Sequence, residues 1–137
     1  MAGLWFTILL SSSVLAAPLR VVATSPQLAE LAFQLGLEES LVGTTDFSDY
    51  PEAARNIPRI GPPFSPGFEK VYALNPSLIL LDESTLGTTF EAALHLKKLP
   101  TLRLDLSSPE KLFESIDRLL IQTQRQAPAF VTEMKRT

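Results

Sequence analysis

Apolar and polar residues recur with two different spacings along this chain of 137 residues, and the change of spacing predicts strands and helices in turn. A β-branched run at 19–23 predicts a first strand, and the Thr-Ser-Pro sequence after it predicts the start of a helix. Ser25 suits the N-cap, and Pro26 suits the first helical position because its missing N–H has no partner there. Apolar residues then recur at helical spacing up to a stop at Gly36, at Leu28, Leu31, Ala32 and Leu35.

Three more apolar runs suit strands. Residues 41–44 follow the first helix closely, and residues 102–104 form a short run farther along. The run at 78–81 is continuously apolar, which is typical of a strand covered on both faces. Strands and helices that alternate in this order predict an α/β fold, a single Rossmann-like lobe in which helices flank both faces of a mostly parallel sheet.

Helices are expected between and after these strands. Residues 68–74 would form a short helix, and Thr88 with Glu91 predicts a capping box for a helix that ends near residue 98. A Ser-Pro-Glu sequence at 108–110 predicts the start of the last long helix. The apolar residues of that helix form one stripe, made of Leu112, Phe113, Ile116, Leu119 and Leu120.

Two segments contain too many turn-forming residues for regular structure. Residues 46–51 form a polar loop after the second strand, and residues 58–66 carry four prolines and one glycine. We interpret the second segment as an ordered surface loop.

Composition narrows the function classes. Apolar residues make up 45% of the chain and charged residues 20%, as in soluble globular proteins. The net charge is −3 and there is no wide run of basic residues, so nucleic acid is a poor candidate partner. Without cysteine the chain has no disulfide and no thiolate metal site, and His95 is its only histidine, so no metal site is predicted.

The sequence does not favour an enzyme. It has no Gly-rich phosphate loop and no Gly-x-Ser-x-Gly elbow. Asp82 and Glu83 follow the 78–81 strand, but as neighbours they point in different directions and do not make an obvious acid/base pair. No resident cofactor is expected.

The first residues look like an export signal. An apolar block at 4–10 is too short to span a bilayer, and small residues follow it. Val14 and Ala16 suit the positions before a cleavage site, so residues 1–16 are predicted to be a signal peptide and the mature chain to begin near Ala17. The missing basic residue before the block leaves a buried first strand or helix as the alternative.

Several motifs together carry a family resemblance. The order is Ser25-Pro26, a Glu-Leu-Ala-Phe sequence at 30–33, Val42-Gly43, Phe-Ser-Asp-Tyr-Pro at 47–51, and Phe-Glu-Lys-Val through Asn-Pro-Ser-Leu-Ile-Leu at 68–80. In this order they resemble the helical-backbone (class III) periplasmic solute-binding proteins of ABC importers, and above all the cobalamin receptors among them. These receptors deliver cobalamin, haem or ferric siderophores to inner-membrane permeases.

The resemblance implies a domain organisation. Such receptors have two α/β lobes joined by one long helix, with the ligand in the cleft between the lobes. Residues 17–123 match the N-terminal lobe, and 124–137 would be the start of the connecting helix, truncated. The second lobe is absent from the sequence, which implies a truncated receptor, a split receptor with that lobe on another chain, or a fragment.

The resemblance also implies site residues. Phe47, Tyr50 and Phe64 are expected to bind the ligand, because aromatic faces near the carboxyl ends of parallel strands suit a large flat chelate. Phe47 could instead fill the gap between its loop and the sheet, and Asp49 and Tyr50 could instead be architectural, with Asp49 accepting backbone hydrogens of its own turn. Glu69 is expected to dock the permease, or to complement the dipole of its helix.

The leading hypothesis is therefore a secreted, periplasmic ligand-capturing lobe for cobalamin or an iron chelate such as haem or a ferric siderophore. Its partners would be that small-molecule chelate, an inner-membrane ABC permease and a second lobe on another chain. The alternative is a stand-alone or truncated periplasmic interaction domain without small-molecule transport. A periplasmic enzyme or chelatase on the same lobe is a third and weaker hypothesis.

Overall fold

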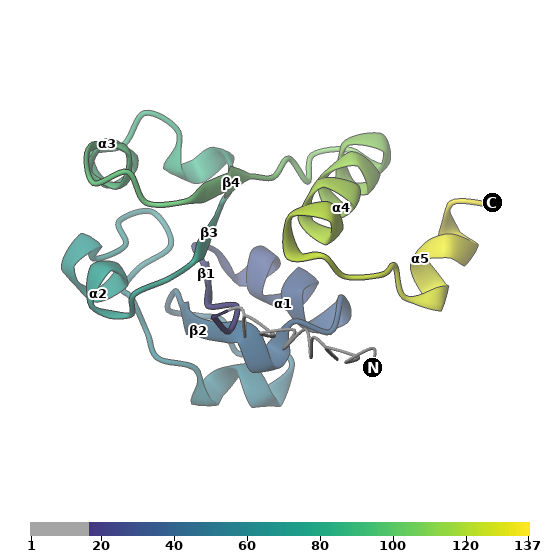
Figure 1. The fold of residues 1–137 in the computed structure, drawn as a ribbon, viewed down its shortest axis with the longest axis horizontal. Helices are drawn as coiled ribbons and strands as arrows, with labels where there is room; N and C mark the ends of the chain where they lie inside the picture. Colours follow the sequence, from purple (N-terminus) through teal and green to yellow (C-terminus); the bar gives the residue numbers. More distant parts are fainter. Residues whose placement is uncertain (1–16) are drawn as a thin grey trace, which may run out of the picture.

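Four parallel strands form one sheet in the order β2-β1-β3-β4 in the computed structural model, which describes residues 17–137 (Figure 1). The strands are β1 (Val21–Ala23), β2 (Leu41–Thr44), β3 (Leu78–Leu81) and β4 (Thr101–Arg103). The predicted parallel α/β sheet is therefore confirmed. The predicted signal peptide at 1–16 lies outside the described residues.

Helices cover both faces of the sheet. Helices α1 (Pro26–Gln34), α4 (Pro109–Thr123) and α5 (Ala129–Met134) lie on one side, and α2 (Phe68–Ala73) and α3 (Thr89–Leu96) on the other (Figure 1). Short 3-10 helices complete the order at Glu38–Ser40, Glu52–Asn56 and Glu83–Thr85. None of the helices in residues 17–137 combines the length and the apolar character needed to cross a membrane.

The buried side chains divide between the two faces as the pleat of the strands requires. Val21 and Leu80 belong to the cluster beneath α1, α4 and α5, whereas their neighbours Val22 and Ile79 belong to the cluster beneath α2 and α3. All four residues of β3 are buried. The continuous apolar run therefore reflects a central strand that is covered on both sides.

Side-chain caps fix where the long helices begin. The Ser25 hydroxyl accepts a hydrogen bond from the Leu28 N–H at 3.3 Å, and Ser108 does the same for α4. Thr88 caps α3 as predicted, but Glu91 accepts from the N–H of Gly87, at 2.8 Å, rather than from that of Thr88. Helix α3 ends at Leu96, two residues before the predicted end.

The last segment folds back onto α4. Helix α4 ends where Gln124 takes a left-handed conformation with φ 54°, and α5 begins after Pro128. Val131 is 1% exposed and belongs to the buried cluster beneath α1, α4 and α5. The Lys135 ammonium lies 2.6 Å from a carboxylate oxygen of Asp117. The segment 124–137 therefore contains one short helix, α5, that packs on the lobe. Its continuation into a connecting helix stays a prediction.

Candidate functional site

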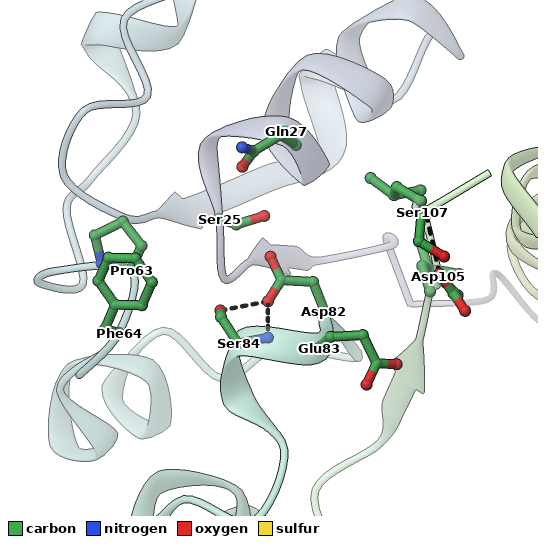
Figure 2. Close-up of a pocket in the computed structure, with 11 residues that line it drawn as sticks. Ser25, Gln27, Pro63, Phe64, Asp82, Glu83, Ser84, Asp105 and Ser107 are labelled. Atoms are coloured by element: carbon green, nitrogen blue, oxygen red, sulfur yellow. Dashed lines mark hydrogen bonds between the residues drawn. The ribbon is translucent and has the colours of Figure 1, made fainter. Parts of the chain in front are cut away.

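The carboxyl ends of β1, β3 and β4 surround an open hollow of about 380 Å³ (Figure 2). After β1 the chain crosses toward β2, and after β3 it crosses toward β4, so neighbouring strands at the centre send their connections in opposite directions. Open α/β sheets hold ligands in the crevice at this kind of switch point. The hollow is therefore the candidate site.

Four segments line the hollow. The start of α1, the loop after β3, the loop after β4 and the proline-rich loop contribute to it (Figure 2). The lining residues are Ser25, Gln27, Pro63, Phe64, Asp82, Glu83, Ser84, Leu104, Asp105, Leu106 and Ser107. Polar side chains from the sheet edge thus face an aromatic ring from the loop.

Asp82 is held by its own turn. One of its carboxylate oxygens accepts from the Ser84 N–H at 2.9 Å and from the Ser84 hydroxyl at 2.5 Å. Beneath it, a guanidinium N–H of Arg103 donates to the Asp82 backbone carbonyl at 2.7 Å, while the same side chain pairs with Glu91. The turn is therefore anchored to β4, and the Asp82 carboxylate has a defined position.

Asp105 is held by two neighbours. Its carboxylate lies 2.7 Å from the Lys111 ammonium and accepts from the Ser107 N–H at 3.0 Å. The hydrogen bond from Lys111, followed by those from Ser107, lowers the pKa of Asp105 from 3.8 to about 2. The buried Ser115 hydroxyl also bonds both backbone polar groups of Asp105, which fixes the loop after β4.

The predicted ligand residues separate in the structure. Phe64 is 78% exposed and lines the hollow (Figure 2). Phe47 is 76% exposed and is absent from the lining, so it does not fill a gap against the sheet. Tyr50 lies at a second hollow of about 260 Å³, beside Phe33 and Pro51.

The two remaining predictions concern Glu69 and Asp49. Glu69 is exposed in the first turn of α2, an orientation that suits both docking and the helix dipole. The Asp49 carboxylate meets Arg59 at 3.3 Å. The turn at 46–51 is therefore tied by a residue from the proline-rich loop rather than by Asp49 accepting its own backbone hydrogens.

Sequence reasoning missed most of the lining. The sequence pattern predicts a helix cap at Ser25 and no acid/base pair at Asp82 and Glu83, and it does not by itself indicate that the three residues share a site. A general signal is present in the sequence: each of these residues comes one or two positions after the end of an apolar strand run, and the carboxyl ends of parallel strands meet at one edge. Among residues 17–137, no three His, Asp or Glu side chains converge as a metal site would require.

A comparison with protein families decides the assignment. A family model described as "Periplasmic binding protein" matches residues 21–137. The chain belongs to this family. The match covers every strand of the sheet and helices α1 to α5.

Individual relatives agree with the family. The chain is 40% identical over 81 residues to the vitamin B12-binding protein of Photorhabdus laumondii, covering 57% of this chain and 30% of that protein. It is 29% identical over 105 residues to an uncharacterised ABC transporter substrate-binding lipoprotein of Bacillus subtilis, covering 74% and 33%. The matched segments thus span about a third of these relatives.

A solved structure matches the fold over a similar part of the chain. A periplasmic haem-binding protein from Pseudomonas aeruginosa superposes with a TM-score of 0.73 and 25% identity. The superposition covers 79% of this chain and 39% of that structure. The described lobe therefore corresponds to less than half of a solved receptor.

Proposed function

We propose that this chain is the N-terminal, ligand-capturing lobe of a periplasmic ABC-importer receptor for cobalamin or an iron chelate, such as haem or a ferric siderophore. Its role is binding and delivery rather than catalysis. The observation that carries the proposal is the hollow at the carboxyl edge of the sheet, with the exposed Phe64 ring on one side of it. A ring that is 78% exposed on a proline-rich loop can cover a flat macrocycle without first being uncovered.

A direct binding measurement tests this proposal. The purified chain is titrated with cyanocobalamin, haemin and ferric siderophores by calorimetry, with thermal shift as a second readout. We expect micromolar or tighter binding of one chelate and a loss of affinity of at least about tenfold in Phe64→Ala. Leu96→Ala is the matched control, since Leu96 is 80% exposed on α3 and lies outside the hollow.

Two outcomes would overturn the proposal. Failure of a folded chain to bind any of the chelates would do so, and equal losses in Phe64→Ala and Leu96→Ala would remove the hollow as the site. Phe47→Ala and Tyr50→Ala extend the test, because both rings are exposed away from the lining of the hollow. A loss in either variant would extend the ligand surface beyond the hollow.

The receptor role also requires a permease. We infer that Glu69 contacts basic residues of an inner-membrane permease, because an exposed carboxylate in the first turn of a short helix is open to such a partner. Glu69→Lys should reduce stimulation of a reconstituted cobalamin importer that lacks its own receptor. Glu52→Lys, at another exposed carboxylate, is the control. Equal stimulation by both variants would leave Glu69 with its helix-dipole role only.

A second candidate function rests on exposed apolar side chains near the end of the chain. Ile121 is 77% exposed, Met134 53% and Phe130 43%, on α4 and α5. A stand-alone interaction domain would contact its partner through these side chains, as would a receptor whose second lobe is on another chain. Ile121→Ser would weaken a protein complex in either case, whereas only the receptor would bind a chelate.

A further inference from the structure

The charges at the hollow are unbalanced. Asp82, Glu83 and Asp105 line it, and no basic residue within 17–137 does. Lys111 neutralises Asp105 in an ion pair, whereas Asp82 and Glu83 take part in no ion pair within residues 17–137. Two negative charges at the hollow are therefore left without a cation in contact.

The nearby cations do not cancel these charges. Arg103 donates a hydrogen bond to the backbone carbonyl of Asp82, but its guanidinium forms an ion pair with Glu91 of α3. Asp105 raises the pKa of Lys111 by its hydrogen bond and its charge, and Glu83 adds to the shift through its charge. The field of Glu83 thus reaches the Lys111–Asp105 pair, but Lys111 is held by Asp105.

The hydrogen-bonding capacity of Asp82 and Glu83, the acidic wall of the hollow, also favours a ligand that donates hydrogen bonds. An ionised carboxylate only accepts hydrogen bonds, and the Ser84 hydroxyl already donates to Asp82. The Asp82 and Glu83 side chains thus offer acceptor positions beside a hollow that no lysine or arginine of the described residues lines (Figure 2). A ligand amide N–H would form a charge-assisted hydrogen bond there, whereas a ligand carboxylate would meet like charge.

We propose that this lobe selects an uncharged or cationic chelate with peripheral N–H donors and disfavours chelates whose periphery carries carboxylates or catecholates. The inference rests on the proposed function and narrows its ligand class. Asp82 and Glu83 are the specificity-determining residues: they favour the donor-rich ligand and repel the anionic one.

Matched ligand pairs test the inference independently of the macrocycle. The first pair is cyanocobalamin and its monocarboxylate, in which one peripheral amide is hydrolysed. The second pair is haemin and its bis-amide, in which both propionates are converted to primary amides. We expect the amide form to bind at least about tenfold tighter within a pair at low salt, with the ratio falling as ionic strength rises.

Charge-neutralising variants locate the effect. Asp82→Asn with Glu83→Gln should bring the ratio of affinities close to one, and Asn can still accept the Ser84 N–H that holds the turn. Glu83→Gln alone is the safer variant for folding, since the Glu83 carboxylate makes no hydrogen bond within residues 17–137. The control is Glu38→Gln with Glu39→Gln, which removes the same charge from the segment that leads into the other end of β2.

The outcomes separate the two proposals. Tighter binding of the amide forms, lost in the Asp82/Glu83 variant and kept in the Glu38/Glu39 variant, supports the inference. If chelates bind but the acid and amide forms bind alike, or the ratio survives in the Asp82/Glu83 variant, the inference is overturned and the receptor role stands. If a folded chain binds none of the four ligands and no ferric siderophore, both are overturned.

Discussion

The guanidinium of Arg59 donates a hydrogen bond to the backbone carbonyl of Ser48 at 3.0 Å. It also donates to the Thr45 carbonyl at 2.9 Å and lies 3.3 Å from the Asp49 carboxylate. Phe47 lies between Thr45 and Ser48 in the sequence. One side chain from the proline-rich loop therefore holds the turn that presents Phe47.

Arg59→Met should lower the free energy of unfolding by about 1–2 kcal/mol, because two backbone carbonyls lose a charged donor that is only partly replaced by water. Urea unfolding followed by circular dichroism measures this change. The control is Arg55→Met, since Arg55 is exposed and makes no hydrogen bond or ion pair within residues 17–137. Equal losses in the two variants would contradict a clamp at Arg59.

Phe47 has a left-handed backbone, with φ 68°. Side chains with a Cβ are strained in this region and glycine is not, so Phe47→Gly should be more stable than Phe47→Ala by about 1 kcal/mol. The matched pair is Gln122→Gly and Gln122→Ala on the exposed side of α4, where the order should reverse by a similar amount. Alanine being preferred at both sites would contradict a left-handed Phe47.

The local patterns of the sequence predicted the fold because each one acts over a few residues. The Ser25 cap, the Thr88 cap and the continuous run of β3 appear where periodicity and capping preferences place them. Glu91 departs from its expected role: one of its oxygens pairs with Arg103, twelve residues away, and the other accepts from Gly87. An ion pair across the fold thus changed the expected capping geometry.

The candidate site was harder to predict because its residues come from distant segments. Phe64 and Asp105 are 41 positions apart and meet only through the strand order β2-β1-β3-β4. The hydrogen bond from Arg59 to Ser48 also joins two separate loops, so the composition of the turn wrongly suggested that Asp49 holds it by accepting backbone hydrogens of that turn. The family resemblance predicted Phe64 as a site residue. The acidic wall of Asp82 and Glu83 could be recognised only once the strand order was known.

Val131 tests whether the last helix belongs to the folded lobe. It is 1% exposed in the buried cluster beneath α1, α4 and α5. Val131→Ala should therefore lower the free energy of unfolding by about 1–3 kcal/mol through lost burial and a small cavity. Its neighbour Thr132 is exposed, and Thr132→Ala should change stability by less than about 0.5 kcal/mol. Chemical denaturation measures both, and a neutral Val131→Ala would contradict the packing of α5.

Asp105 should make folding sensitive to acid. Hydrogen bonds from Lys111 and Ser107 lower its pKa from 3.8 in the unfolded chain to about 2 in the fold. A lowered pKa means that the ionised carboxylate stabilises the folded state above the unfolded value, and that this stabilisation is lost as the pH falls from about 4 toward 2. The fall in stability over this window should therefore be shallower in Asp105→Asn than in the unchanged chain.

Denaturant midpoints measured at pH 5, 4, 3 and roughly 2.5 give the comparison, since the slope of stability with pH counts the protons taken up on unfolding. Lys111→Met should flatten the same window, because it removes the first cause of the pKa shift. Glu52→Gln, at an exposed carboxylate outside every ion pair of residues 17–137, should show the same fall in stability with pH as the unchanged chain. Parallel pH profiles for Asp105→Asn and the unchanged chain would show that the Lys111–Asp105 pair does not hold the loop beside the hollow.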